Sequence, residues 1–424
     1  MPNRLVDKAF FSIYDAAWAA LTPMLRKNHR LADGFRLRTL AKPELTQADL
    51  WIQSASAGEA YLAWEILKRL PQSASRSILL TANTRQGVEI LCQAAQEFQN
   101  YHRQAAVQVT YFPFDRPVTM QKAIDAIRPH VMVLLESELW PALLHGLKRS
   151  GARVFIINGR MTQKSLCRYL IWPSFWRNLR PDAILAISRE DAVRFARLFG
   201  PQGVTVMSNI KFDRLDGSEP PVMIENPLDA YLPFGSDFLI LGSIRQAEEK
   251  DATRIILEIL RRHPDTVIGL FPRHMHRIEH WQQMLKASGV PWLLRSELKA
   301  VIPEGSVILW DVFGELSLAY MKSAGAFVGG SLAPLGGQNF LEPLMHGIPT
   351  IIGPHWDNFR WVGQAIIDRK IVQQASSWRD VAERLITVIN YPSNKKTVRL
   401  QALSYIRHRQ GGTDTACRLI GEYL

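Results

Sequence analysis

Cysteine is scarce in this chain and follows no pattern. The 424 residues hold three cysteines, Cys92, Cys167 and Cys417, with no Cys-x-x-Cys pair among them. An odd, scattered set argues against a disulfide framework and predicts a reducing compartment. Internal repeats and low-complexity tracts are missing too. Hydrophobic residues make up 47% of the chain and charged residues 21%, which excludes the disordered and fibrous classes.

Long apolar runs are also missing. No stretch reaches the roughly 18 uninterrupted apolar residues of a membrane-spanning helix. Near the N-terminus, however, one helical face is apolar, formed by Phe11, Tyr14, Trp18, Leu21 and Leu25. Basic residues follow this face: Arg26, Lys27, Arg30, Arg36, Arg38 and Lys42. Two interpretations stay open: a helix in the interface of an anionic membrane leaflet, and an amphipathic helix packed on the first domain.

Acidic residues are in deficit. The chain has 51 Lys and Arg against 39 Asp and Glu, a formal net charge of +12. This balance predicts an anionic partner, which could be nucleic acid, a membrane surface, or a phosphorylated or carboxylated substrate. The basic residues are spread out and no aromatic-basic recognition motif appears. We therefore expect no nucleic acid partner, and a basic nucleic-acid-binding protein remains the alternative from another class.

Short apolar runs alternate with helical patterns in two regions, which predicts two doubly wound α/β sheets. The runs of the first region are 50–52, 78–80, 107–109, 131–135, 154–157 and 183–185, and those of the second are 238–241, 267–271, 307–309, 326–328 and 350–352. The predicted division is an amphipathic, membrane-associating segment 1–45, a Rossmann-like domain 46–215, a Pro- and Gly-rich linker 216–235, and a second Rossmann-like domain 236–424. By fold analogy, the last helices cross back to the first domain. We expect the GT-B architecture, in which two such domains face a central cleft.

Polar clusters follow the predicted strands, where ligands bind in such sheets. In the first region, Glu59 opens a helix and could take a proton from a hydroxyl, or simply complement the helix dipole. Glu136 and Glu138 close the strand at 131–135, and their repulsion tends to raise one pKa. Arg160 could supply a cation to this pair. Lys211 could neutralise a phosphate or carboxylate, and an ordinary surface lysine is the alternative.

In the second region, Pro272 and Arg273 end a strand, and Arg273 suits a bidentate contact to an oxyanion. Gly314 and Glu315 could approach a ribose, with a helix N-cap as the alternative. The glycine-rich segment Gly329–Pro343 should present backbone N–H groups to an anion, with the side chains of Asn339 and Glu342 at its mouth. Because the pair His274 and His276 lies on an irregular segment without nearby cysteine, we expect no metal.

Taken in order, these motifs resemble the 3-deoxy-D-manno-octulosonic acid (Kdo) transferases of Gram-negative bacteria. The motifs that carry the resemblance are Ser56-Ala57-Gly58-Glu59, Glu136 to Pro141, Asn158-Gly159-Arg160, Lys211-Phe212-Asp213, Pro272-Arg273-His274, Gly314-Glu315-Leu316, Gly329 to Pro343 and Gly353-Pro354-His355. Each is weak alone, and the ordered set is specific.

The resemblance implies an inverting transfer of Kdo from CMP-Kdo to the lipid A precursor at the cytoplasmic face of the inner membrane, without a metal or other cofactor. It implies that Glu59 is the general base, and that Glu136, Glu138 and Lys211 position the acceptor and stabilise the transition state. It assigns CMP binding to Pro272, Arg273, Phe313, Gly314, Glu315, Leu316, Asn339, Phe340, Leu341 and Glu342. The chain departs from the family pattern at Ile244-Arg245, usually Thr-His, at Gln338, usually His, and at Phe340, usually Pro. A GT-B enzyme that uses another nucleotide sugar or acceptor is the nearest alternative.

Overall fold

The computed structural model describes residues 4–41, 45–71, 77–215, 226–233, 235 and 237–424, without the side chains of residues 4–8, 29 and 30. The chain divides into two compact units, Met1–Asp216 with Arg409–Leu424, and Gly217–His408. Residues 216–225 of the predicted linker lie outside the described residues, and Pro227–Ala230 forms a 3₁₀ turn.

The first unit is built on a parallel sheet with the strand order β3-β2-β1-β4-β5-β6-β7. Its strands are β1 Leu50–Ser54, β2 Ser77–Ala82, β3 Ala106–Tyr111, β4 Val131–Leu135, β5 Arg153–Gly159, β6 Ala183–Ala186 and β7 Val204–Val206. Strands β1 and β4 are buried at every position, as expected for central strands covered on both faces.

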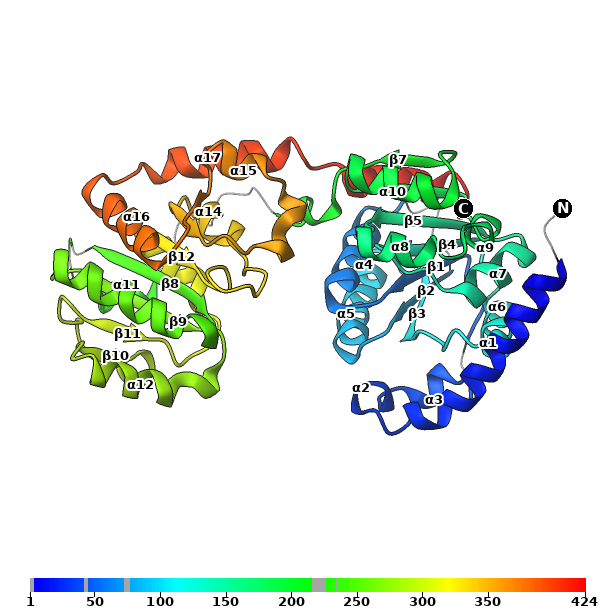
Figure 1. Ribbon diagram of the computed structural model, residues 1–424, viewed down its shortest axis with the longest axis horizontal. Helices are drawn as coiled ribbons and strands as arrows, with labels where there is room; N and C mark the ends of the chain where they lie inside the picture. The colour runs from blue at the N-terminus through cyan, green and yellow to red at the C-terminus, as the bar shows by residue number, and fades with distance from the viewer. Residues whose placement is uncertain (1–3, 42–44, 72–76, 216–225, 234, 236) are drawn as a thin grey trace. The chain divides into compact units, whose positions relative to one another are not determined.

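Helices cover both faces of this sheet (Figure 1). The apolar cores place α4 Ala57–Arg69, α5 Arg85–Tyr101 and α18 Gly412–Gly421 on one face. The other face is covered by α6 Pro117–Ile127, α7 Pro141–Ser150, α8 Gln163–Tyr169, α9 Pro173–Asn178 and α10 Arg189–Phe199. The short helices α2 His29–Ala32 and α3 Phe35–Arg38 precede β1.

Helix α1, Arg4–Leu25, packs on the first unit through Phe11, Tyr14 and Trp18 of the predicted apolar face. Leu21, predicted on the same face, is instead 51% exposed. Phe10, Phe11 and Tyr14 contact the core beneath α6 and α7, and the Tyr14 hydroxyl donates to Asp115 at 3.0 Å. Arg116 forms two 3.0 Å hydrogen bonds to Asp15. The structure therefore supports the packed interpretation for this face. No described helix is both long and apolar enough to span a bilayer.

The basic residues after α1 separate into two kinds. Arg26 and Lys27 are exposed, whereas Arg38 is only 2% exposed, donates to the Asn83 carbonyl at 2.7 Å and stacks over the Tyr111 ring. Arg38 is thus a buried structural residue, not part of a basic surface. Lys42 and the side chain of Arg30 lie outside the described residues.

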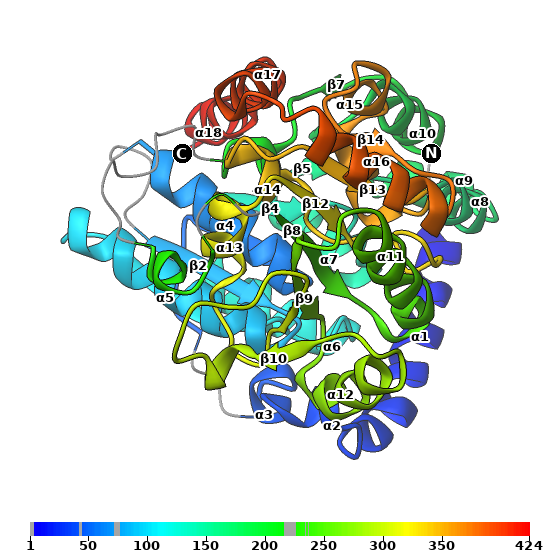
Figure 2. The same ribbon diagram turned by 90° about the vertical axis from the view of Figure 1, so that its left-hand side faces the viewer.

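The second unit repeats the architecture, with the strand order β10-β11-β9-β8-β12-β13-β14. Its strands are β8 Phe238–Ile244, β9 Val267–Pro272, β10 Trp292–Leu294, β11 Val307–Leu309, β12 Gly325–Val328, β13 Thr350–Ile352 and β14 Gln373–Gln374. Its helices are α11 Glu249–Arg262, α12 Ile278–Ala287, α13 Leu316–Lys322, α14 Leu341–Met345, α15 Ala365–Asp368, α16 Trp378–Asn390 and α17 Lys395–Arg407. Helices α11 and α16 lie side by side over one face of this sheet (Figure 2).

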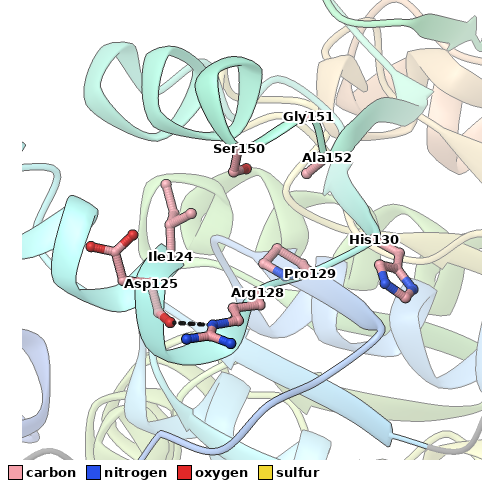
Figure 3. A pocket seen from close by; sticks show the side chains of 8 residues that line it. All are labelled: Ile124, Asp125, Arg128, Pro129, His130, Ser150, Gly151 and Ala152. Carbon is pink, nitrogen blue, oxygen red and sulfur yellow. Dashed lines mark hydrogen bonds between the residues drawn. The ribbon is translucent and has the colours of Figure 1, made fainter.

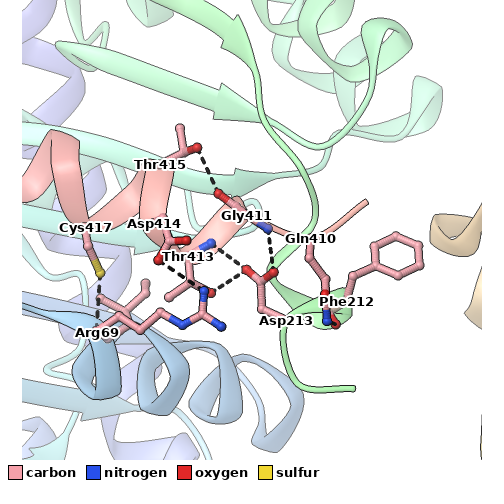
Figure 4. Close-up of polar contacts among 10 residues, drawn as sticks. Arg69, Phe212, Asp213, Gln410, Gly411, Thr413, Asp414, Thr415 and Cys417 are labelled. Carbon is pink, nitrogen blue, oxygen red and sulfur yellow. Dashed lines mark hydrogen bonds and ion pairs between the residues drawn. The ribbon is translucent and has the colours of Figure 1, made fainter. Parts of the chain in front are cut away.

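The C-terminal helix α18 belongs to the first unit, and Asp213 fixes its start (Figure 4). The Asp213 carboxylate accepts the N–H groups of Gly411 and Thr413 at 2.7 and 2.6 Å, and the Thr413 hydroxyl at 2.6 Å. Gly412 is required beside it, because a Cβ there would lie 2.1 Å from the Ser208 carbonyl oxygen. Asp213 lies two residues after the predicted site residue Lys211, and its carboxylate is therefore used to hold the start of α18.

The substitution Asp213→Asn should lower the free energy of unfolding by about 2 kcal/mol, since hydrogen bonds to a charged partner contribute roughly 1.5–3 kcal/mol and an amide cannot accept all three donors. The matched control is Asp414→Asn. That side chain is 60% exposed and pairs with Arg69, so its loss should cost under about 1 kcal/mol. Urea denaturation of the full chain compares the two, and equal midpoints would contradict the role of Asp213.

Candidate active site

The predicted carboxylates lie at the point where the strand order of the first sheet reverses. Strand β1 lies between β2 and β4, so the connections after β1 and β4 leave the same edge of the sheet toward opposite faces. This switch point is where open α/β sheets bind ligands. Glu59 follows β1, while Glu136 and Glu138 follow β4.

Glu59 is half-buried in the first turn of α4. Ser56 caps this helix by accepting the Glu59 N–H at 3.4 Å, and Glu59 Oε2 accepts the Ala55 N–H at 2.5 Å. Burial above all, together with the negative charges of Glu138 and Glu136, raises the pKa of Glu59 to about 8, against the hydrogen bonds from Ala55 and Ser56. The side chain both closes the helix end and holds a proton near neutral pH.

Glu136 forms an ion pair with the lysine of the site, Lys211. Its backbone is left-handed, with φ of 57°, which turns the chain sharply after β4. Lys211 Nζ lies 2.7 Å from Glu136 Oε1, and both side chains are mostly buried. Lys211 is held by the 3₁₀ turn Ile210–Phe212, which Asn209 caps by accepting the Lys211 N–H at 3.0 Å.

Arg160, expected as a possible cation for the acidic pair, forms no ion pair with any residue that the structure describes. Its backbone N–H donates to the Glu136 carbonyl at 3.4 Å. The neighbouring Asn158 is fully buried, and its side-chain oxygen accepts the Ile210 N–H at 2.9 Å. Asn158 therefore supports the turn that carries Lys211.

Three side chains donate hydrogen bonds to Glu138. Its Oε2 accepts Trp140 Nε1 at 2.8 Å, and the side-chain amides of Gln53 and Asn83 at 3.3 Å each. Burial raises the pKa of Glu138, and these donors act against that shift. Sequence reasoning did not single out Gln53 or Asn83 as site residues. The available signal was a polar residue at the end of an apolar strand run, where it needs a buried partner.

In the second unit, Arg273 follows β9 and its side chain is exposed. Pro272 is buried as the last residue of β9. His274 and His276 stack with ring centroids 5.4 Å apart. Within the described ranges, no group of three or more His, Cys, Asp or Glu residues is arranged to hold a metal ion, and the expected lack of a metal stays a prediction.

The glycine-rich segment is organised differently from our expectation. Four of its N–H groups, from Gly330, Ser331, Leu332 and Ala333, donate to the buried carboxylate of Glu248, at distances of 2.5 to 3.4 Å. These groups therefore already have an anion, supplied by the chain itself. The expectation that this stretch presents its N–H groups to a ligand is corrected for residues 330–333.

The other predicted donor residues fall into two sets. Asn339 and Phe313 have exposed side chains, Phe313 at 82%, and Glu342 and Leu316 are half-buried. Phe340 and Leu341 are buried in the core, so only their backbone atoms could meet a ligand. The side chain of Phe340 packs against Trp356 and Phe359.

Glu315, expected near a ribose, is already engaged. Arg295 donates two hydrogen bonds to its carboxylate, at 2.8 and 3.1 Å, and Trp310 donates a third at 3.0 Å. The adjacent Gly314 has φ of 87° and open space around its Cα, so the backbone there can be approached closely. Glu315 thus holds this turn in place through its hydrogen bonds with Arg295 and Trp310.

A cavity of about 530 Å³ lies at the opposite edge of the first sheet (Figure 3). Its lining includes Arg128, Pro129 and His130, which precede β4, and Ser150, Gly151 and Ala152, which precede β5. Because it lies at the amino ends of the strands, this cavity is separate from the candidate site.

Comparison with known proteins shows similarity to one family. Residues 29–214 match the family model for 3-deoxy-D-manno-octulosonic-acid transferase (kdotransferase), a span that contains Glu59, Glu136, Glu138 and Lys211. The 3-deoxy-D-manno-octulosonic acid transferase of Haemophilus influenzae is 27% identical over 382 residues, covering 88% of this chain and 87% of that protein.

The chain is a Kdo transferase homologue. A bifunctional glycosyltransferase/methyltransferase of Fusobacterium nucleatum is 26% identical over 355 residues, covering 82% of this chain. The chain spans only 54% of the length of that relative. Over most of its length the chain is therefore similar to glycosyltransferases.

Two solved structures are similar to this Kdo transferase homologue. A glycosyltransferase from Rickettsia africae has a TM-score of 0.58 and 10% identity, covering 89% of this chain and 98% of that one. This likeness agrees with the predicted GT-B fold class. The C-terminal CMP-Kdo binding domain of WaaA from Acinetobacter baumannii has 27% identity and a TM-score of 0.38, covering 41% of this chain and 90% of that one.

The raised pKa of Glu59 predicts a pH-dependent effect on stability. Since the ordinary pKa is 4.5 and the folded value is about 8, the folded Kdo transferase homologue keeps a proton that the unfolded chain releases. The stability from this group is complete below about pH 4.5 and is lost as the pH rises toward 8. Glu59→Gln cannot ionise, so its free energy of unfolding relative to wild type should increase between pH 5.5 and pH 8.

Denaturant unfolding at both pH values measures this difference. Glu89→Gln is the matched control, because Glu89 is an exposed residue on α5 that pairs with Arg85. The control should show no comparable trend. A flat difference for Glu59→Gln as well would contradict the raised pKa.

Proposed function

We propose that this chain is an inverting glycosyltransferase that transfers Kdo from CMP-Kdo to the lipid A precursor, lipid IVA, in lipopolysaccharide biosynthesis. The family relationship supports Kdo transfer, and the motif resemblance supports the choice of donor and acceptor. One observation carries the mechanism: Glu59 has a pKa of about 8 and lies near two other carboxylates, Glu136 and Glu138. A base poised near neutral pH is suited to proton removal from an alcohol.

In the proposed reaction, the ionised form of Glu59 removes the proton of the acceptor hydroxyl as the oxygen attacks the anomeric carbon of Kdo. The bond from that carbon to the phosphate oxygen breaks, and CMP leaves with the electron pair. The proton is accepted by Glu59 Oε1, because Oε2 already accepts the Ala55 N–H. Ser56 Oγ lies 3.3 Å from Oε1 and orients it.

The remaining unit 1 residues have supporting roles in this proposal. Glu138, held by Gln53, Asn83 and Trp140, orients the acceptor. Lys211 stabilises negative charge that develops as the bonds change, and Glu136 holds its ammonium in place at 2.7 Å. No metal or other cofactor is needed for this sequence of steps.

On the donor side, CMP binding is assigned to Arg273, to the backbone at Gly314, and to the segment 339–342. The phosphate is bound by the Arg273 guanidinium, which suits oxyanions. The Phe313 ring, 82% exposed, offers a flat apolar face to the cytosine base. The positive net charge suits a donor and an acceptor that are both anionic.

We also propose that the enzyme acts at the cytoplasmic face of the inner membrane as a peripheral protein. The face of α1 that does not contact the first unit is apolar and exposed: Ile13, Ala16, Ala17, Ala20, Leu21 and Met24. Ile13 and Met24 are 71% and 69% exposed, and Arg26 and Lys27 follow directly. An apolar stripe followed by exposed basic residues fits an anionic bilayer surface.

Glu59→Gln should abolish transfer, with a loss of at least about a hundredfold in kcat, while CMP still protects the protein from thermal unfolding. Loss of a general base removes a factor of roughly 10²–10⁴, and ligand that binds the native state stabilises it. Mass spectrometry of the product from a CMP-Kdo source and tetra-acylated lipid A precursor measures transfer. Near-normal turnover would remove Glu59 from the mechanism.

Thermal protection also tests the donor. CMP should protect the wild-type chain, whereas UDP and GDP should not. Protection by UDP or GDP alone would instead favour a GT-B transferase with another nucleotide sugar.

Substitution of Ile13 and Met24 by Ser should weaken binding to vesicles that contain anionic lipid by at least tenfold, because each buried apolar side chain contributes about 1.5–3 kcal/mol. Point substitutions are preferable to deletion of α1, whose other face covers the core of the first unit. Vesicle co-sedimentation measures the effect. Val301→Ser, at a 59% exposed site in the second unit, is the control. Unchanged sedimentation of the double variant would exclude this face as the membrane contact.

A further inference from the structure

Two arginines emerge side by side from the sheet of the second unit. Ile244 at the end of β8 is in register with Pro272 at the end of β9, and the Arg273 N–H donates to the Ile244 carbonyl at 2.8 Å. Arg245 and Arg273 are the next residues of their strands. Because neighbouring strands are about 4.8 Å apart, the two side chains originate from adjacent points on the carboxyl edge.

Two acidic residues that follow β8 are already occupied. Glu248 accepts the N–H groups of the glycine-rich segment and, at 3.3 Å, that of Arg245. Glu249 accepts two hydrogen bonds from Arg277, at 2.9 and 2.6 Å. No carboxylate of the described residues pairs with the guanidinium of Arg245 or Arg273.

The guanidinium groups of Arg245 and Arg273 therefore place positive charge at this edge, without a carboxylate counterion among the described residues. His274 responds to this field: burial first, and then the charges of Arg245, His276 and Arg273, lower its pKa. Like charges held close together cost free energy that an anionic ligand would remove. A paired guanidinium site of this kind matches the oxygen atoms of a phosphate.

The backbone brings a third element to the same place. The register between β8 and β9 shifts between Leu241 and Ile244, and Ser243 has φ of 56°. The Gly329 N–H donates to the Gly242 carbonyl at 2.8 Å, and a Cβ on Gly329 would lie 3.0 Å from the Ile244 Cα. The glycine-rich segment thus starts against the irregular end of β8, directly before Arg245. Such bulges commonly redirect a side chain at a functional edge.

We propose that Arg245 is a second phosphate-binding residue of the donor pocket, acting beside Arg273 on the phosphate of the nucleotide. This inference rests on the proposed function, since the same edge of the sheet is assigned to CMP. It concerns a position where this chain departs from the pattern it resembles, with arginine in place of the usual histidine. An arginine is charged at any physiological pH, and its fork can donate two hydrogen bonds to one phosphate.

The decisive comparison is between CMP and cytidine, which differ only in the phosphate. Arg245→Gln in the full chain should weaken CMP binding about tenfold or more and leave cytidine binding unchanged, as measured by isothermal titration calorimetry. Arg245→Lys, which keeps the charge but loses the fork, should give an intermediate loss. Arg254→Gln is the control, because Arg254 lies on α11 and pairs with Asp251.

Each outcome decides between the possibilities. Unchanged CMP binding in Arg245→Gln would overturn the proposal, and so would an equal loss for CMP and cytidine, which would indicate a structural role. If wild type binds UMP or GMP in place of CMP and loses that binding in Arg245→Gln, the inference about Arg245 holds and the proposed donor fails. If CMP binds the wild type and Arg245→Gln equally well, the proposed donor survives without Arg245.

Discussion

Both candidate sites depend on one constraint, the parallel pairing of the strands. In a parallel sheet every strand ends at the same edge, so residues distant in sequence meet there without any direct sequence signal. In the first unit this edge unites Glu59 after β1 with Glu136 and Glu138 after β4. In the second unit it unites Arg245 after β8 with Arg273 after β9. The sites differ in charge but have the same origin in the fold.

The two edges carry opposite charge because their counterions are distributed differently. In the first unit Lys211 pairs with Glu136 at 2.7 Å, Glu138 accepts neutral donors, and Glu59 retains a proton to near pH 8. In the second unit two carboxylates next to the arginines already have partners within the fold: Glu248 pairs with backbone N–H groups and Glu249 with Arg277. An unpaired carboxylate can accept a proton, and an unpaired guanidinium can hold an oxyanion. The placement of counterions thus determines the chemistry that each edge can perform.

The central parts of the fold could be predicted from the sequence, because buried strands are continuous apolar runs. Every run that we expected as a strand is one, from β1 to β13. The strands that were missed, β7, β10 and β14, lie at or near the sheet edges and are partly exposed, so selection for apolar residues is weak there. The site residues Glu59, Glu136, Glu138 and Lys211 do come together. Their supports could not be predicted, since Asn83 and Glu138 meet only through the order of the strands.

The glycine-rich segment shows why composition alone misled us about one detail. A glycine that tolerates positive φ, here Gly330 at 70°, lets the consecutive N–H groups that start with its own converge on one anion. The sequence does not say which anion. Glu248, 82 residues before Gly330, fills that position and is only 1% exposed. With its N–H groups already satisfied, the segment has a fixed shape before any ligand arrives. In the proposed function, the phosphate of the donor is then bound elsewhere on the same edge, by Arg245 and Arg273.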